Sequence, residues 1–366
     1  KKKKLKLNSI LLTHHHHDHT AGIEGMLNYQ SVNVYSSNSK IKGTTKIIRG
    51  GDKLDLDISV VEKSTGSATF GAGYGDQNGS TITAGITESN FLGKGQKVKA
   101  SASFSDTQTL YDISITEPYF NNKDLLVRTD LYSTFSDPAN VRYETETIGV
   151  GLSLGFPLSV QNRITTKYSL LSSKTSADTN ATSYEKLLSG TNTISIAGYI
   201  LSLDRRNSPY KPTNGSIFKV EQNLAGIGGT SNYLENKISY KAYKKLSKYV
   251  TGAIKSELGS INGYNGKYAP VDSKFNIGGK SLRGFKYGKV GPQLSGSFTG
   301  GNYYYVIATE TNFDLPIDEY DISSSLFLDF GSVWGLDDRY GNINDEHLLR
   351  SSVGINLNWN SAIGPI

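Results

Sequence analysis

Strict alternation of apolar and polar residues is the feature that most limits how this chain can fold. In residues 97–104 and 148–156, every second side chain is apolar, and the side chains between them are lysine, serine or glycine. A period of two places one set of side chains on each face of a β-strand. The pattern recurs at Ile194, Ile196 and Ile200, at Leu326, Leu328 and Phe330, and at Val353, Ile355, Leu357 and Trp359. The alternation therefore predicts an all-β protein.

Connections of two kinds separate the predicted strands. Residues 121–123 and 157–162 form short breaks, whereas residues 174–192 and 257–274 are long polar stretches. No apolar run approaches the roughly 18 residues that a membrane-spanning helix requires. If the chain crosses a membrane, it must do so as a closed β-barrel, for which short turns at one end and long loops at the other are typical. A soluble β-sandwich or β-helix also alternates and is the alternative.

Composition narrows the classes of partner. The chain has 366 residues with 39 Gly, 23 Tyr, 13 Phe and no Cys, which suits turns, strands and membrane interfaces and offers no disulfide. Its net charge is +6, but Lys1–Lys4 and Lys6 supply five of these units. No basic stripe interleaved with aromatic residues is present, which argues against nucleic acid as a partner. Residues 303–305, three consecutive tyrosines, match an interfacial girdle, although tyrosines are common in any strand.

One arginine stands out in the glycine-rich stretch Gly278–Pro292, GGKSLRGFKYGKVGP. The glycines permit tight bends and close approach to another surface, and Arg283 carries a planar, permanently charged fork of donors. Two strand-like segments follow, in which alternation turns Glu310 and Asp329 away from the lipid-facing residues. Because an inward carboxylate needs a partner, we predict that Arg283 pairs with Glu310 or Asp329 inside a barrel. The alternative is that Arg283 is a solvated loop residue.

Several segments carry a resemblance to a known family. They are VVEKSTGSATFGAGYGDQNG at 60–79, NFLGKGQ at 90–96, ITEPYF at 115–120, LDRRNSPYKPTNGS at 203–216, SLRGF at 281–285, ETNFDLPI at 310–317, FLDFGSVW at 327–334 and SAIGPI at 361–366. Over residues 56–366 the chain thereby resembles BamA-type barrels, the outer-membrane proteins that insert other barrels, and their wider family of POTRA-bearing transporters. The resemblance implies a transmembrane antiparallel β-barrel, sixteen-stranded in the family, in the outer membrane of a Gram-negative bacterium.

The resemblance assigns roles to particular residues. In the family an arginine–glycine–aromatic tip, here Arg283, Gly284 and Phe285, folds into the barrel, and its arginine pairs with carboxylates of the inner wall, here Glu310 and Asp329. These five residues are called the loop–lumen lock below. The residue before the arginine is usually β-branched in the family, and leucine at this position is a mild departure that should not disturb the pairing.

The resemblance also implies a lateral seam. The first barrel strand, near residues 67–75, would offer unpaired backbone groups to an incoming strand, and Gly71, Gly73 and Gly75 weaken side-chain packing there. The implied partners are unfolded outer-membrane protein clients, barrel-assembly lipoproteins and outer-membrane lipid, with no nucleic acid. A TamA-type relative and a two-partner secretion translocator are the alternatives within this class.

The amino-terminal segment resembles a different family. SILLTHHHHDHTAGIEGML contains His14, His16, Asp18 and His19 in the H-x-H-x-D-H pattern of metallo-hydrolases, and residues 3–54 resemble hydroxyacylglutathione hydrolase, of the metallo-β-lactamase fold. The pattern implies two divalent metals that generate hydroxide from water. The further ligands of that family are missing, since the one histidine left is His347. We therefore expect that the protein has no enzymatic activity and binds no cofactor. The weaker alternative is that the incomplete motif binds zinc and that the protein is a metal-dependent hydroxyacylglutathione hydrolase.

These resemblances predict three parts. Residues 1–55 form a partial metallo-β-lactamase-like fragment of small α/β type, residues 56–65 a remnant of the last POTRA strand, and residues 66–366 a BamA-like outer-membrane β-barrel. The terminal residues 361–366 match the start of the family's penultimate strand, so about fourteen well-formed strands are expected. The predicted function is that of an outer-membrane protein assembly factor that folds and inserts β-barrel proteins through a lateral seam, present here as a barrel whose last strands are expected to be truncated.

Overall fold

A computed structural model describes residues 9–12, 33–36 and 46–47, and residues 64–365 apart from 76–77, 138–141, 183–184, 187, 271–272, 295, 315–320, 337–342 and 362–363. The chain separates into two compact units, Lys1–Lys63 and Ser64–Ile366. In the first unit, β1 (Ser9–Leu12), β2 (Asn33–Ser36) and β3 (Lys46–Ile47) form a small parallel sheet in the order β1-β2-β3.

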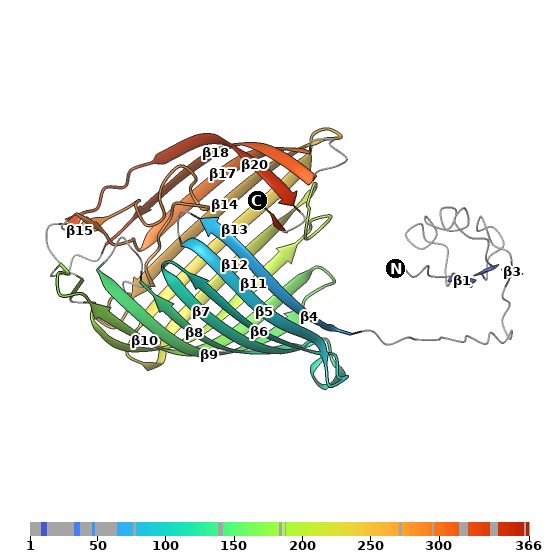
Figure 1. Ribbon diagram of the computed structural model, residues 1–366, viewed down its shortest axis with the longest axis horizontal. Helices are drawn as coiled ribbons and strands as arrows, with labels where there is room; N and C mark the ends of the chain where they lie inside the picture. Colours follow the sequence, from blue (N-terminus) through green and yellow to red (C-terminus); the bar gives the residue numbers. More distant parts are fainter. Residues whose placement is uncertain are drawn as a thin grey trace. The chain divides into compact units, whose positions relative to one another are not determined.

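The second unit is built on one antiparallel sheet of 15 strands, in which chain neighbours pair with each other (Figure 1). All except the two-residue β21 are at least ten residues long, in agreement with the fourteen expected. The strands are β4 (Gly66–Gly75), β5 (Gly79–Phe91), β6 (Gln96–Ser105), β7 (Gln108–Glu117), β8 (Leu126–Ser136), β9 (Tyr143–Pro157), β10 (Asn162–Ala177), β11 (Gly190–Asp204), β12 (Gly215–Gly229), β13 (Tyr233–Lys245), β14 (Val250–Gly263), β17 (Tyr303–Asp314), β18 (Asp321–Trp334), β20 (Arg350–Ser361) and β21 (Gly364–Pro365).

The sheet curls into a wall of inclined strands, with β4 at one end and β20 and β21 at the other (Figure 1). Among the described residues, β4 pairs with β5 alone, and β20 pairs with β18 and, over two residues, with β21. The described part of the chain contains no helix long and apolar enough to cross a membrane. The predicted all-β barrel fold is confirmed, with an edge at each end of the sheet.

The two faces of the wall follow the alternation of the sequence. On β18, Leu326 and Leu328 are 50% and 39% exposed and face outward, while Phe327 and Asp329 are buried on the lumen side. The pleat of a strand produces this division, because successive side chains point to opposite faces. β11 differs, since Ile194 is buried and lies with its lumen-facing neighbours rather than outside.

Connections of different lengths occur at both ends of the wall. Residues 92–95, 158–161 and 246–249 are short links at one end, where residues 205–214 form a longer one. At the other end residues 106–107 and 230–232 are short, and the longest connection in the described unit, residues 264–302, lies there. Within it, β15 (Gln293–Leu294) pairs with β16 (Ser297–Phe298) and with β19 (Ile343–Asn344) from the connection between β18 and β20. A single short 3-10 helix, η1 (Phe120–Asn122), is found in the described barrel unit, in the β7–β8 connection.

Candidate functional site: a loop locked into the barrel wall

The long connection turns back against the wall through glycines in the left-handed region. Gly278 has φ +120°, and a Cβ there would lie 2.4 Å from the Lys286 carbonyl oxygen. Gly284 has φ +83°, and its ideal Cβ position lies 3.2 Å from Ser352 Cβ on β20. Only glycine takes both the backbone conformation and the close approach without strain. The tip that carries Arg283 is therefore pressed against β18 and β20.

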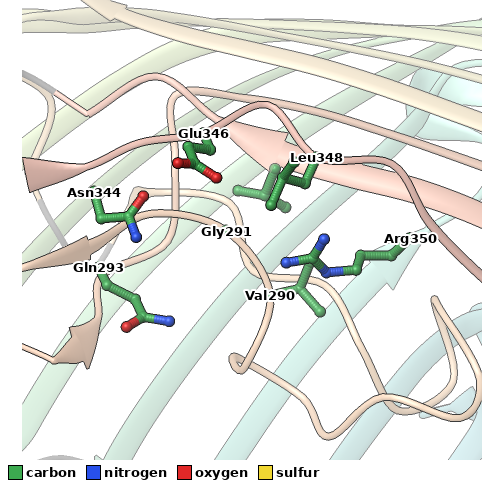
Figure 2. Close-up of a pocket in the computed structure, with 8 residues that line it drawn as sticks. Val290, Gly291, Gln293, Asn344, Glu346, Leu348 and Arg350 are labelled. Atoms are coloured by element: carbon green, nitrogen blue, oxygen red, sulfur yellow. The ribbon is translucent and has the colours of Figure 1, made fainter.

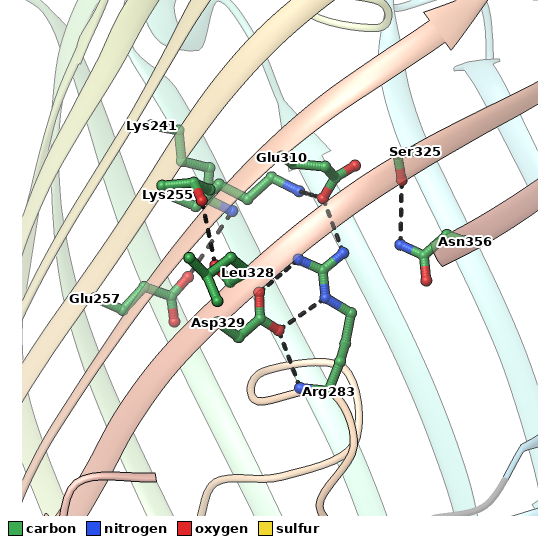
Figure 3. Close-up of polar contacts among 10 residues, drawn as sticks. Lys241, Lys255, Glu257, Arg283, Glu310, Ser325, Leu328, Asp329 and Asn356 are labelled. Carbon is green, nitrogen blue, oxygen red and sulfur yellow. Dashed lines mark hydrogen bonds and ion pairs between the residues drawn. The ribbon is translucent and has the colours of Figure 1, made fainter. Parts of the chain in front are cut away.

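Arg283 lies between the two carboxylates named from the sequence (Figure 3). Its Nε and Nη2 donate to the two oxygens of Asp329 at 2.8 and 2.6 Å, and its Nη1 donates to Glu310 Oε2 at 2.9 Å. The backbone N–H of Arg283 adds a third bond to Asp329 at 3.1 Å. The two-point contact with one carboxylate is the geometry for which a guanidinium is suited. The structure thus brings together Arg283, Glu310 and Asp329.

Burial makes the two carboxylates unequal. The side chain of Asp329 is 0% exposed, that of Glu310 is 10% exposed and that of Arg283 is 18% exposed. Hydrogen bonds from the guanidinium to Asp329, and secondarily to Glu310, raise the pKa of Arg283 above its ordinary value. The arginine is therefore a permanent cation, and Asp329 depends on it most, since its carboxylate has no exposure to water.

Three further residues complete the cluster, and sequence reasoning missed them. The Arg283 guanidinium carbon lies 3.7 Å from the centre of the Phe327 ring, and Lys255 Nζ lies 3.3 Å from Glu310 Oε2. Ser352 Oγ donates to the Arg283 carbonyl oxygen at 2.5 Å. Phe327 was within reach of the sequence, because it stands two residues before Asp329 and alternation puts both on one face. Nothing in the local sequence marks Lys255 or Ser352.

Apolar packing holds the same connection in place. Ile277, Leu282 and Val290 pack with Val306 of β17 and Val333 of β18, and all five are at most 5% exposed. The aromatic member of the lock, Phe285, is partly buried against this cluster. A second cluster unites Ala269 and Phe275 of the connection with wall residues Ile194, Ala225, Tyr233 and Ile261. Leu282, the departure from the family motif, is 0% exposed. The tip is therefore anchored by packing as well as by charge.

The side chains of the three consecutive tyrosines point to both faces of the wall. Tyr304 faces the lumen and packs on Phe275 with ring centres 4.6 Å apart. Tyr303 and Tyr305 lie on the outer side near Trp334, at ring-centre distances of 5.8 and 5.9 Å. An interfacial girdle thus fits the outer pair only, because alternation turns the central tyrosine inward.

A small polar recess lies where the long connection meets the segment after β18 (Figure 2). It is lined by Val290, Gly291, Gln293, Val333, Asn344, Glu346, Leu348 and Arg350. Its residues come from the long connection, from the β18–β20 connection and from the adjoining ends of β18 and β20, so the recess belongs to the contact between these two connections.

The predicted seam glycines lie on the edge strand. Gly71, Gly73 and Gly75 share the lumen face of β4, paired with Thr83, Thr81 and Gly79 of β5. A Cβ built on any of the three would meet no atom within 4 Å, and all ten positions of β4 are exposed. These glycines therefore do not make room for a neighbouring side chain of the described wall.

The predicted metal ligands His14, His16, Asp18 and His19 lie outside the described residues. Within the described part of the chain, no group of three or more His, Cys, Asp or Glu side chains is arranged to hold a metal ion. The hydrolase-like motif therefore stays a prediction.

Comparisons with known proteins agree with this barrel and its inward loop. The family model of the Omp85 superfamily domain matches residues 90–366, so the chain belongs to the Omp85 superfamily. Among its relatives, the outer membrane protein assembly factor BamA of Neisseria meningitidis serogroup B is 27% identical over 361 residues, covering 86% of this chain and 45% of that protein. The chain thus spans less than half of this relative.

Solved structures point to the same class. The crystal structure of BamA from Haemophilus ducreyi lacking POTRA domains 1–3 is similar with a TM-score of 0.71 and 26% identity, over 83% of this chain and 66% of that one. CdiB from Escherichia coli has a TM-score of 0.53 and 15% identity, over 82% and 57% of the two chains, which shows a shared fold alone.

Proposed function

We propose that this protein folds and inserts β-barrel proteins into the outer membrane of a Gram-negative bacterium through a lateral seam at β4. The weak packing of the first barrel strand carries the proposal. All ten positions of β4 are exposed, and Gly71, Gly73 and Gly75 leave its lumen face without side-chain contacts, so this strand can exchange its pairing for that of an added strand. The membership in the Omp85 superfamily and the similarity to two BamA proteins support this function.

The loop–lumen lock has a supporting role in the proposal. Arg283, Gly284 and Phe285 fix the long connection to β17, β18 and β20, and the described contacts of the lock do not involve β4. The proposed partners are unfolded outer-membrane protein clients, barrel-assembly lipoproteins and the surrounding lipid.

Site-specific crosslinking tests the seam, because the chain contains no cysteine. Gly73→Cys places a thiol on the edge strand, and Gly151→Cys places one on the same face of the central strand β9, where the atoms nearest to the new Cβ belong to Ser169 and Asp130, at 3.6 and 3.8 Å. In a Gram-negative host, a client with a cysteine in its terminal strand should form a disulfide with Gly73→Cys and not with Gly151→Cys. Equal crosslinking of both variants would reject a seam at β4.

A translocator function is the second candidate of the same class, and the shared fold with CdiB is its support. A translocator passes an extended chain through the lumen, where this protein has Leu282 and Ile277 at most 1% exposed against the wall. The packed loop favours insertion at the seam over passage through the lumen.

The proposal includes no enzymatic activity and no cofactor. The amino-terminal motif lacks the additional histidines and the bridging aspartate of the resembled hydrolases, so it cannot complete two metal sites. Purified protein should not turn over a glutathione thioester. Turnover that is abolished by His16→Ala would instead support the hydrolase.

A further inference from the structure

The outward face of β12–β14 carries polar side chains where apolar ones surround them. Gln222 on β12 is paired directly with Asn236 on β13, and Asn236 is paired with Ser260 on β14. Along the register the next partner of Ser260 is Tyr303 on β17. These residues belong to the set of positions that alternation places outside, because Leu224, Ile238 and Leu258 on the same faces are 39%, 39% and 47% exposed.

Hydrogen bonds join these side chains across the strands. Gln222 Nε2 donates to Asn236 Oδ1 at 2.7 Å, and Asn236 Nδ2 donates to Ser260 Oγ at 3.3 Å. Beside them, Tyr303 Oη donates to Asn262 Oδ1 at 2.6 Å. We call Gln222, Asn236, Ser260, Asn262 and Tyr303 the outer polar row.

The row lies where hydrocarbon should cover the wall. On β13 the outward neighbours of Asn236 are Leu234 and Ile238, and on β14 an outward neighbour of Ser260 is Leu258. A polar group in hydrocarbon costs free energy unless it is hydrogen-bonded. The bonds within the row use only part of the capacity of its amides and hydroxyls, so it can still donate to and accept from a partner.

The position of the row indicates the outer leaflet. Asn236 is three residues from the end of β13 at Tyr233, and Ser260 is three residues from the end of β14 at Gly263. These ends adjoin the long connection, and long loops lie on the extracellular side of such barrels. At about 3.3 Å per residue and a strand tilt of about 40°, Asn236 and Ser260 lie roughly 8 Å below the ends of their strands, whereas Asn262 and Tyr303 lie at the strand ends. That depth corresponds to the upper acyl region rather than to charged headgroups.

The chemistry of the row selects a class of lipid. The row contains no charged residue, so it does not recognise phosphate by charge, and it offers donors together with acceptors. Ester carbonyls of glycerophospholipids can only accept hydrogen bonds, whereas amide-linked hydroxyacyl chains both donate and accept. We propose that the outer polar row binds the amide-linked hydroxyacyl region of a lipid A-type glycolipid. The proposal rests on the outer-membrane location and not on the assembly activity.

Thermal unfolding of the full chain in detergent tests this site, with heat-modifiable gel mobility as the readout. Lipid A, monophosphoryl lipid A and phosphatidylethanolamine are added separately. Both lipid A forms should raise the unfolding midpoint several times more than phosphatidylethanolamine does. The increase should be lost in the triple variant Gln222→Leu, Asn236→Leu and Ser260→Ala. It should persist in Ser256→Ala, which removes an outward hydroxyl of β14 outside the row.

Other results would overturn the proposal. An equal increase with phosphatidylethanolamine would indicate general lipid stabilisation, and an increase confined to the doubly phosphorylated lipid would indicate recognition of charge. If mass measurement shows dimers that the triple variant abolishes, the row is a contact between copies of this chain. Asn236→Leu alone removes both hydrogen bonds that link Gln222, Asn236 and Ser260. This single variant is used instead if the triple variant does not fold. A lipid A response unchanged by Asn236→Leu would reject the site.

Discussion

The lumen faces of the two halves of the wall are built in opposite ways. On β11–β14, β17 and β18, buried apolar residues such as Ile261, Val306 and Val333 pack against the long connection. On β4–β8, Ser114 is the one buried residue among those described, and every position of β4 is exposed. The lumen face of β11–β14, β17 and β18 is therefore part of a packed core, whereas the lumen face of β4–β8 is exposed. The difference shows that the same alternating strands can give a rigid support or an available edge.

Glycine has a different role in each half. On β14, a Cβ at Gly259 would lie 2.3 Å from Tyr304 and 2.9 Å from Phe275, so glycine there makes room for the two rings. On β4, a Cβ at Gly73 would meet no atom within 4 Å. Packing therefore explains the glycine of the supporting half, whereas in the edge half glycine leaves the strand without side-chain contacts that could hold it. Substitutions in each half test whether the two halves differ in packing.

The largest effect is expected from Arg283→Ala. It removes three side-chain hydrogen bonds and leaves Asp329, which is 0% exposed, without its cation. Stranding a buried charge in this way costs about 3 to 5 kcal/mol. The midpoint of urea-induced unfolding in lipid vesicles should fall accordingly. Lys255→Ala is the control, because Lys255 is 38% exposed and Glu310 remains paired with Arg283 when Lys255 is removed. Equal losses in the two variants would show that the lock does not depend on burial.

Sequence reasoning identified the charged part of this site, because Arg283, Glu310 and Asp329 carry chemistry that needs partners and stand in segments that resemble a family. The fold was accessible as well. Strict alternation predicts strands and left a soluble β-sandwich or β-helix open, and the resemblance to BamA-type barrels decided for the barrel. The apolar anchoring was not accessible. Period two separates two faces but does not say which face is covered, and β11 turns Ile194 inward because the long connection covers it.

A somewhat smaller loss is expected from Leu282→Ala. Leu282 precedes the arginine, is 0% exposed and packs with Ile277, Val306 and Val333. Truncating a buried leucine costs about 2 to 5 kcal/mol through lost burial and the cavity left behind. The same urea titration measures it. Leu158→Ala, at a site 56% exposed in the β9–β10 turn, is the control and should change the free energy of unfolding by less than about 0.5 kcal/mol. A loss below that of the control would mean that charge alone anchors the loop.

Gly259→Ala should have an intermediate effect. The added methyl group would overlap the rings of Tyr304 and Phe275, which are themselves 4.6 Å apart, so both rings must move. Overpacking of this kind costs about 1 to 3 kcal/mol. Limited proteolysis of the long connection is a second readout, since the displaced Phe275 should loosen it. Unchanged stability and unchanged cleavage would show that the supporting half tolerates extra volume and is not a packed core.

The smallest effect on stability is expected from Gly73→Ala, the same substitution in the other half. The new methyl group enters open space on the lumen face of β4, so no side chain must move. Alanine also loses less backbone entropy than glycine in a strand, which offsets any small cost and keeps the change in the free energy of unfolding within about 0.5 kcal/mol. Insertion of a client barrel should nevertheless slow if β4 must stay weakly packed to accept a strand. The two readouts separate the explanations. A destabilisation as large as that of Gly259→Ala would mean that β4 is packed in the folded protein and the two halves are alike, whereas intact stability with slower client insertion would assign the glycines to the seam.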